Sequence, residues 1–264
     1  MIDEIEIPQS FPSPGTVSGK RVVITGGSRG LGALLAHAFS HAGASVALVA
    51  RTERDLKAVA EALPGPSLVL SGDVTDEDFN EEVADTAVSE WGGLDAWIGN
   101  AGISPVVAGP RRTESSVWRQ ILEVNLTGAF LGARAASRVM GEGGRLIFTS
   151  SVLAERPRKG LTAYSASKAG VVGMAKGMAL DLAPFHIRVN TICPGCVLTS
   201  ATEREWIKLG MTKEEWISDR AALHMMKRVG EAIEVANAIL FMASDEASFI
   251  TAAHLLVDGG YTGQ

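Results

Sequence analysis

Tyr164 and Lys168 are the pair of side chains best suited to exchange a proton with a bound molecule. Four residues apart, they lie on one face of a helix. A free phenol titrates near pH ~10. A neighbouring positive charge favours the phenolate, so we expect the pKa of Tyr164 to be lowered. Tyr164 could then pass a proton to a carbonyl oxygen or take one from an alcohol, although an isolated Tyr–Lys pair also occurs on exposed amphipathic helices.

Ser151 and Asn125 are polar residues that could assist this pair. Ser151 follows an apolar run, and its hydroxyl could hydrogen-bond the reacting oxygen and hold it in place. Asn125 interrupts an otherwise apolar helical stretch, where its amide competes for backbone hydrogen bonds. A buried amide needs partners, and these are either a water that leads to Lys168 or a purely structural hydrogen bond.

A glycine-rich loop spans residues 25–32, between an apolar run and an Ala/Leu-rich helical stretch. Glycines allow a tight turn and a close approach to a diphosphate, whose charge is then met by the helix N-terminus. A glycine-rich turn without a ligand is the alternative. The residues expected to contact the ligand are Gly26, Ser28, Arg29, Gly30 and Leu31.

Arg51 lies where the next apolar run ends, just before a helix that Thr52 and Asp55 could begin as a capping box. In a dinucleotide-binding fold, a carboxylate at the end of this strand binds the ribose 2′-OH of NAD and repels a 2′-phosphate. Here Ala50 takes that place and a cation follows. We therefore expect NADP(H), with NAD(H) as the other possibility and a solvated arginine as the alternative explanation.

Small and polar residues also follow the third and fourth apolar runs. Asp73, with Val74 beside it, could place a carboxylate against an adenine amino group or could only cap the following helix. Asn100, Ala101 and Gly102 supply small residues where the backbone would pass close to a flat ring. A C-x-x-C motif, Cys193 to Cys196, invites a thiol-redox interpretation, but such motifs normally open a helix early in a small domain.

Alternating strand-like and helical segments must position these residues. Apolar runs at 21–25, 45–49, 67–70, 96–99, 145–149, 188–192 and 254–257 predict strands. Helical patterns cover 31–41, 54–63, 76–91, 116–140, 164–183 and 232–243. This alternation predicts an α/β doubly wound Rossmann fold, with a predominantly parallel sheet, helices on both faces and ligands beyond the carboxyl ends of the strands.

Composition narrows the function. A net charge of −6 without a basic stripe argues against nucleic-acid binding, and no apolar run is long enough to span a membrane. Residues 1–18 have no signal-peptide pattern, so we expect a cytoplasmic protein with a flexible N-terminal extension and one catalytic domain at 19–264. No metal site is expected.

The segment 198–228 is a long excursion between a strand and a helix, which is typical of a mobile lid. Its apolar side chains suggest a substrate pocket, although subunit interface and helix core are alternatives. These are Trp206, Met211, Trp216, Met225 and Met226, joined by Val106 and Val107. His224 and Arg158 are possible polar contacts to a substrate.

The motifs together resemble the short-chain dehydrogenase/reductase superfamily, in its single-domain branch of similar length. The resemblance covers most of the chain, from Gly19 to Gly260. It rests on T-G-x-x-x-G-x-G at 25–32, D-V at 73–74, N-A-G at 100–102, Asn125, Ser151, Tyr164 and Lys168, P-G at 194–195 and V-D-G-G at 257–260. Gly99 replaces a frequent asparagine, and Ala252-Ala253 replace a common Gly-Gln.

The resemblance implies a seven-stranded sheet and a catalytic tetrad. The tetrad is Asn125, Ser151, Tyr164 and Lys168. It also implies that Tyr164 and Lys168 help to bind the nicotinamide ribose and that Pro194, Gly195, Val197 and Thr199 line the nicotinamide site. A homodimer or homotetramer is expected, built on the helices that carry Asn125 and Tyr164.

The expected activity is hydride transfer between NADP(H) and a carbonyl or secondary alcohol carbon of a small molecule, as in ketone or ketoester reductases. One alternative is an NAD-dependent alcohol or polyol dehydrogenase of the same fold. The other is a non-catalytic, cofactor-sensing protein. Such proteins tend to lose the proton-transfer residues, and this chain keeps all four.

Overall fold

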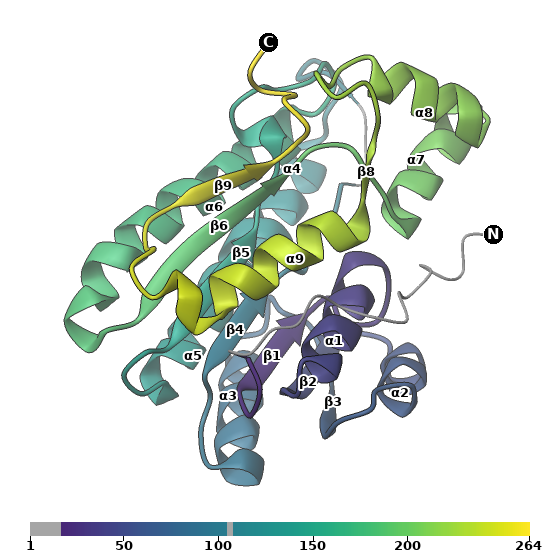
Figure 1. Cartoon of the computed structure of the whole chain (residues 1–264). Coiled ribbons are helices and arrows are strands. Elements are labelled where there is room, and N and C mark those ends of the chain that lie inside the picture. The colour runs from purple at the N-terminus through teal and green to yellow at the C-terminus, as the bar shows by residue number, and fades with distance from the viewer. Residues whose placement is uncertain (1–16, 105–107) are drawn as a thin grey trace.

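Seven short apolar runs form one parallel sheet, as the sequence predicts (Figure 1). The computed structural model describes residues 17–104 and 108–264. Most of the predicted N-terminal extension, together with Val106 and Val107, therefore lies outside the described residues. The strand order is β3-β2-β1-β4-β5-β6-β9. The order reverses beside β1, so the carboxyl ends of β1 and β4 flank the expected ligand crevice.

The strands begin and end close to the predicted positions. The sheet strands are β1 (Arg21–Thr25), β2 (Ser45–Ala50), β3 (Ser67–Ser71), β4 (Ala96–Gly99), β5 (Arg145–Thr149), β6 (Arg188–Pro194) and β9 (His254–Val257). Two further strands of two residues, β7 (Val197–Leu198) and β8 (Gly230–Glu231), pair with each other outside this sheet and were not predicted.

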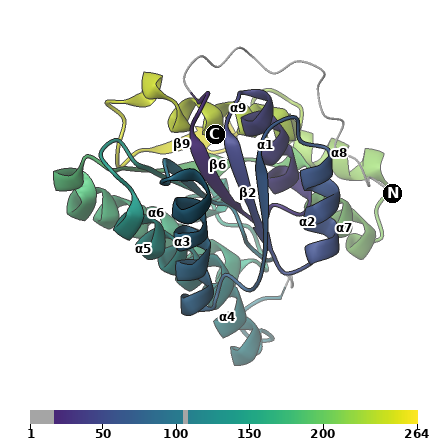
Figure 2. The same ribbon diagram turned by 90° about the horizontal axis from the view of Figure 1, so that it is seen from below.

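Helices cover both faces of the sheet (Figures 1 and 2). The α-helices are α1 (Gly30–His41), α2 (Glu53–Glu61), α3 (Glu77–Trp91), α4 (Ser115–Leu122), α5 (Gly128–Val139), α6 (Thr162–Leu182), α7 (Ser200–Leu209), α8 (Lys213–Ala221) and α9 (Ala232–Ala243). Short 3₁₀ turns lie at η2 (Val152–Ala154), η3 (Ala183–Phe185) and η4 (Asp245–Ala247). No helix in the described ranges is long and apolar enough to cross a membrane.

Strand alternation divides the core into two layers. In β1, Val22 and Ile24 pack into a cluster with α1 and α9, whereas Val23 packs into the cluster of α3, α5 and α6. Successive side chains of a strand point to opposite faces, so an all-apolar strand requires a cover on each side. These two buried layers fix the sheet, and the sheet in turn holds the loops at its carboxyl edge.

The helix predicted over 116–140 is interrupted. A π-helical segment, η1 (Glu123–Thr127), separates α4 from α5, and the N–H of Gly128 donates to the carbonyl of Glu123. The interruption contains Asn125, whose side chain is engaged in tertiary hydrogen bonds. Single π-helical turns inside helices frequently mark functional sites.

One of the two departures from the family pattern has a steric explanation, and the other keeps a backbone conformation that favours glycine. A Cβ at Gly99 would lie 2.5 Å from the Phe148 ring, so the larger side chain on β5 requires glycine opposite it. Ala252 has φ 58°, a left-handed conformation that glycine adopts without penalty. The alanine therefore retains the backbone conformation for which the usual glycine is suited.

The excursion after β7 is a pair of helices with a small core of its own. Trp206 of α7 and Trp216 of α8 are buried, with ring centroids 5.6 Å apart, and Met211 packs against them. Thr212 begins α8 with a capping box completed by Glu215. The two tryptophans are therefore helix core, as one alternative held, whereas Met225 and Met226 are exposed.

Candidate active site

Thr25 and Asn100 join the carboxyl ends of three neighbouring strands. Asn100 Nδ2 donates to the Thr25 carbonyl at 3.0 Å, and the N–H groups of Asn100 and Ala101 both donate to Thr25 Oγ1 at 3.0 Å. Thr149 Oγ1 donates to Asn100 Oδ1 at 3.3 Å. The Asn100 side chain thus fixes the crevice between β1, β4 and β5 by hydrogen bonds within the protein.

The glycine loop has the geometry of an anion-binding turn. A Cβ at Gly32 would lie 2.0 Å from the Gly26 carbonyl oxygen, so only glycine permits this loop–helix contact. Among the described residues, the N–H groups of Ser28, Arg29, Gly30 and Leu31 donate to no protein acceptor. Free N–H groups at the start of α1 form a ready-made site for a diphosphate, and this observation fits the expected dinucleotide.

The end of β2 leaves a cation exposed. Arg51 lies between β2 and α2 and is exposed, and its backbone carbonyl accepts a hydrogen bond from Ser71 Oγ. Thr52 precedes α2 as expected, but its side chain makes no capping hydrogen bond, so the predicted capping box is wrong. Its backbone is extended, with φ −108° and ψ 98°, and no N–H of the first turn of α2 donates a hydrogen bond to its hydroxyl.

Asp73 is held in a local turn, and Val74 is buried beneath α5. Asp73 Oδ1 accepts hydrogen bonds from the N–H and the hydroxyl of Thr75. The side chain that caps α3 is Asp76, which accepts from the N–H of Phe79. The capping alternative for Asp73 is therefore wrong, because the helix begins one turn later than that role requires.

Tyr164 and Ser151 meet from α6 and the end of β5. Burial raises the pKa of Tyr164 to about 12, whereas its hydrogen bond with Ser151 acts in the opposite direction. Glu205 of α7 is among the negative groups that raise it further. The expected lowering of this pKa is therefore wrong for the chain by itself, and at neutral pH Tyr164 is a protonated phenol that can donate.

Lys168 does not lower the Tyr164 pKa because its ammonium is turned toward the backbone. Lys168 Nζ donates to the Thr149 carbonyl at 2.7 Å and lies 5.7 Å from the centroid of the Tyr164 ring. Burial lowers the pKa of Lys168 to about 8. The Ser150 hydroxyl donates to the Lys168 carbonyl, which fastens α6 to the end of β5.

Asn125 lies against the same cluster. Its Oδ1 accepts from the Ile103 N–H at 2.7 Å, and its Nδ2 donates to the Ile103 carbonyl and to Ser167 Oγ, both at 3.0 Å. A Cβ at Gly102 would lie 3.3 Å from Asn125 Oδ1 and 3.4 Å from Lys168 Nζ. The hydrogen bonds agree with the structural alternative for the Asn125 side chain, which holds the loop beside Lys168.

Pro194 is the last residue of β6, and Gly195, Val197 and Thr199 lie beyond it along the chain. The Gly195 N–H donates to the Val257 carbonyl, and Val197 pairs with Gly230. Together with β9 and the start of α9, Gly195 and Val197 line a cavity of about 280 Å³. Thr199 is buried immediately before α7, so this segment joins the sheet edge to the two-helix excursion.

The two cysteines are free thiols. Cys193 lies within β6 and is buried, and burial raises the pKa of both Cys193 and Cys196. A reactive thiol needs a lowered pKa and access to solvent. The structure therefore offers no support for the thiol-redox interpretation.

His224 is a structural residue rather than a substrate contact. It is buried, its Nδ1 donates to the Arg220 carbonyl at 2.8 Å and its Nε2 accepts from the Cys196 N–H at 3.2 Å. Both ring nitrogens are thus used by the backbone. Arg158 lies 3.5 Å from Glu205, so the loop after Ser151 is linked to α7.

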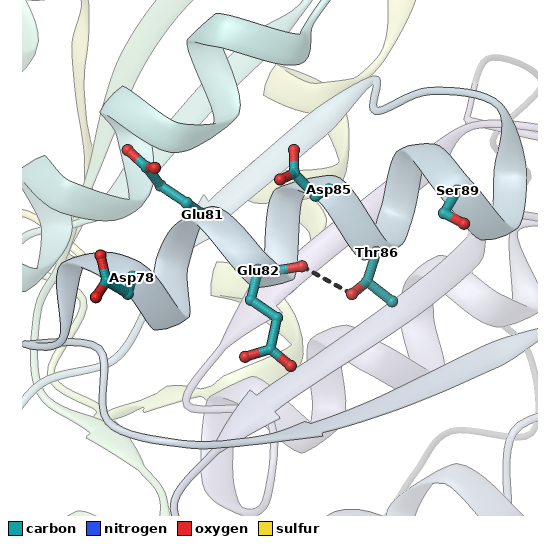
Figure 3. Close-up of a pocket in the computed structure, with 6 residues that line it drawn as sticks. All are labelled: Asp78, Glu81, Glu82, Asp85, Thr86 and Ser89. Carbon is teal, nitrogen blue, oxygen red and sulfur yellow. Dashed lines mark hydrogen bonds between the residues drawn. The ribbon is translucent and has the colours of Figure 1, made fainter.

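A shallow surface concavity elsewhere has no part in this site. It lies along one face of α3, as Figure 3 shows, and its lining residues all come from that helix. They are Asp78, Glu81, Glu82, Asp85, Thr86 and Ser89. The described residues contain no group of three or more His, Cys, Asp or Glu side chains arranged for a metal ion.

Sequence reasoning missed three contributors to the site. Thr25 accepts the hydrogen bonds that join β1 to β4, Ser167 supports Asn125, and Glu205 influences Tyr164 from α7. Thr25 begins the glycine motif, so its position was a signal. The other two lie in helices, and only the tertiary fold brings them to the site.

Comparison with known proteins identifies one protein family along most of the chain. A family model described as Enoyl-(Acyl carrier protein) reductase matches residues 26–262. The chain is 36% identical to a 3-alpha-(or 20-beta)-hydroxysteroid dehydrogenase of Mycobacterium bovis, covering 93% of this chain and 90% of that protein. It is 37% identical to cyclopentanol dehydrogenase of Comamonas sp., covering 94% and 99% respectively.

A solved structure gives the same result for the fold. A short-chain type dehydrogenase/reductase from Mycobacterium marinum superposes with a TM-score of 0.86 at 33% identity, covering 94% of this chain and 98% of that one. The chain therefore belongs to the short-chain dehydrogenase/reductase family of oxidoreductases, whose members act on alcohol and ketone groups with a nicotinamide cofactor.

Proposed function

We propose that this protein is an NADP(H)-dependent reductase of ketones or related carbonyl compounds. The observation that carries the proposal is the placement of Tyr164, which is hydrogen-bonded to Ser151 and has Lys168 Nζ 5.7 Å from its ring centroid. A neutral phenol is a proton donor, and carbonyl reduction needs a proton at the oxygen. The bound nicotinamide supplies or accepts the hydride.

The chain's own residues divide the remaining work. Ser151 Oγ would hydrogen-bond the substrate oxygen and orient it against Tyr164 Oη, which donates its proton to that oxygen. Lys168, whose ammonium donates to the Thr149 carbonyl, would hold the nicotinamide ribose beside Tyr164. Asn125 is a positioning residue, because its side chain fixes the Gly102–Ile103 backbone beside Lys168.

The cofactor would lie along the carboxyl edge of the sheet. The free N–H groups at the start of α1 suit its diphosphate, and Arg51, exposed beyond β2, suits a 2′-phosphate. Residues 100–102 and 194–199 would line its nicotinamide half. We extend this proposal to one catalytic unit over residues 19–264, located in the cytoplasm.

Cofactor choice is the first testable consequence. We expect the wild type to prefer NADPH over NADH in kcat/KM. Arg51→Ala should raise the KM for NADPH about tenfold and leave that for NADH nearly unchanged, because one charge-assisted hydrogen bond to phosphate is lost. Ala50→Asp should reverse the preference by repelling the 2′-phosphate. Steady-state kinetics with both cofactors measure this, and equal or better use of NADH by the wild type would contradict NADP(H) as the cofactor.

One observation favours an NAD-dependent alcohol dehydrogenase as the second candidate. Both relatives named above carry dehydrogenase names, one for a hydroxysteroid and one for cyclopentanol. Such an enzyme would use the same residues in the reverse direction, with Tyr164 accepting the proton. Oxidation of cyclic secondary alcohols with NAD, faster than reduction of the matching ketones with NADPH at neutral pH, would favour this candidate.

We also propose a homodimer or homotetramer. Two apolar side chains near the end of α6, Leu180 and Phe185, are exposed, as are Trp118 and Phe130 on the helices that flank Asn125. A Cβ at Gly173 or Gly177 would contact nothing within 4 Å, so this face of α6 would allow a second helix to approach closely. These features favour assembly through the helices that carry Asn125 and Tyr164.

A further inference from the structure

Two helix N-termini meet at the glycine loop. Helix α1 begins at Gly30 and α7 begins at Ser200. A Cβ built on Gly30 would lie 3.2 Å from Ser200 Oγ, so the first turn of α7 is in contact with the loop. Figure 2 shows α7 and α8 on the same side of the molecule as α1 and α2. Each helix N-terminus carries partial positive charge, so their approach is unfavourable without an anion.

Two arginines add charge at the same place. Arg29 precedes α1, and Arg204 lies one turn beyond Ser200 on α7; both are exposed. Within the described ranges, neither guanidinium has an ion pair or a hydrogen bond. The pKa of Arg204 is lowered by burial and by the nearby Arg29, and Glu203 opposes this in part. Positive charge therefore accumulates where α7 meets the glycine loop.

The backbone at this junction also presents hydrogen-bond donors. The N–H groups of Ser28 to Leu31 have no acceptor among the described residues, as noted above. Donors and cations that converge without a protein partner favour an anionic ligand. Arg204 would approach that ligand from α7, whereas Arg29 and the N–H groups approach it from the loop.

We propose that Arg204 is a phosphate-binding residue that holds the diphosphate of the dinucleotide from the side of α7. This inference rests on the proposed function, since it takes the dinucleotide as the ligand. The diphosphate is the group concerned because the contact is at Gly30, at the start of α1, whereas Arg51 stands at the separate end of β2. Every dinucleotide of this class carries the diphosphate, so Arg204 does not discriminate between NADPH and NADH.

Helix α7 also carries a residue that acts on the proton donor. Glu205 is the next residue of α7, and its Oε1 forms ion pairs with Arg220 Nη2 at 2.9 Å and with Arg158 Nη2 at 3.5 Å. Its negative charge also raises the pKa of Tyr164. A diphosphate bound by Arg29 and Arg204 would fix α7 against the loop and thereby fix Glu205 beside the proton donor. The bound dinucleotide would therefore order α7.

Equilibrium binding to the full chain tests the assignment without any turnover. Arg204→Ala should weaken the binding of NADPH and of NADH by the same factor, about tenfold, as measured by calorimetry. Lys213→Ala is the matched control, because Lys213 is an exposed cation of the same lid at the start of α8. It should bind both cofactors like the wild type. Arg51→Ala should weaken NADPH alone.

Hydrogen exchange supplies the second readout. In the wild type, NADH should protect the amides of α7, and in Arg204→Ala this protection should be lost at equal cofactor saturation. Unchanged affinity for both cofactors in Arg204→Ala would overturn the inference, and so would a loss confined to NADPH, which would assign Arg204 to the 2′-phosphate. A wild type that binds neither cofactor would instead overturn the proposed function.

Discussion

Replacing Tyr164 with phenylalanine should reduce turnover by several orders of magnitude while NADPH still binds. The variant keeps the aromatic ring and removes only the hydroxyl that donates the proton. The phenol, whose pKa is raised to about 12 by burial, is protonated at neutral pH, so the wild type carries the proton that the variant lacks. Steady-state kinetics of carbonyl reduction, with a separate binding measurement for NADPH, give the result.

Ser167→Ala is a useful comparison for this variant. Ser167 lies on the same helix as Tyr164, and its replacement by alanine also removes a single hydroxyl. That hydroxyl contacts Asn125 and the Tyr164 carbonyl. We expect only a modest loss of activity there. If Tyr164→Phe retains more than roughly a tenth of the wild-type kcat/KM, a loss of under about 1.4 kcal/mol, Tyr164 is not the proton donor.

Lys168→Met should abolish activity and stabilise the folded protein at the same time. Burial lowers the pKa of Lys168 from 10.5 to about 8, which costs roughly 3 kcal/mol of folding free energy while the lysine is charged. Methionine removes that cost. Loss of the hydrogen bond from the charged ammonium to the Thr149 carbonyl takes back about 2 kcal/mol. We therefore expect a net gain of about 1 kcal/mol in the free energy of unfolding near neutral pH.

The pH dependence identifies the cause of this gain. A lysine with a lowered folded-state pKa releases its proton on folding, so its penalty is full below about pH 8 and disappears as the pH rises toward 10.5. The stability difference between Lys168→Met and the wild type should shrink over that window. Urea unfolding of both proteins at several pH values measures it. A variant that is less stable than the wild type at neutral pH, or a difference independent of pH, would contradict the explanation.

The sheet could be predicted from the sequence because its strands are short, apolar and separated by helical patterns. Buried parallel strands read as continuous apolar runs, and β1 with its Val22, Val23 and Ile24 is such a run. The glycine loop marked where the first strand ended. Helix ends were correct to within about two residues, which is ordinary for boundaries set by capping and fraying.

The π-helical segment around Asn125 could not be predicted. It differs from the flanking helix only in the hydrogen-bond partner of a few N–H groups, and residues on either side keep the apolar pattern. Asn125 was a signal that something interrupts the helix. Its partners, Ile103 and Ser167, come from segments distant in sequence, so the type of interruption depended on tertiary contacts.

The direction of the Tyr164 pKa shift, for the chain by itself, was predicted wrongly for a related reason. Helical spacing places both side chains on one face of α6, but it does not tell where the ammonium points. The Thr149 carbonyl, at the end of β5, takes the Lys168 hydrogen bond, and burial then dominates both pKa values. The direction of the Lys168 ammonium therefore depends on the packing of β5 beside α6, which the helical spacing does not contain.

The two-helix excursion of α7 and α8 is a further example of what the sequence pattern does not predict. Trp206 and Trp216 suggested a substrate pocket because aromatic residues in a long excursion often line one. The structure buries them against each other, since two short helices that leave the main core need a core of their own. Arg204 of α7 was not singled out, because its neighbour Arg29 is far away in sequence.

The central claim is tested most directly by measuring NADPH oxidation by the wild-type protein against a panel of ketones, ketoesters, aldehydes and quinones, with Tyr164→Phe assayed beside it. We predict turnover with at least one ketone or ketoester, formation of the corresponding alcohol in equal amount to the NADPH consumed, and no turnover by the variant. NADPH oxidation that yields no alcohol, or that proceeds equally in Tyr164→Phe, would contradict the account.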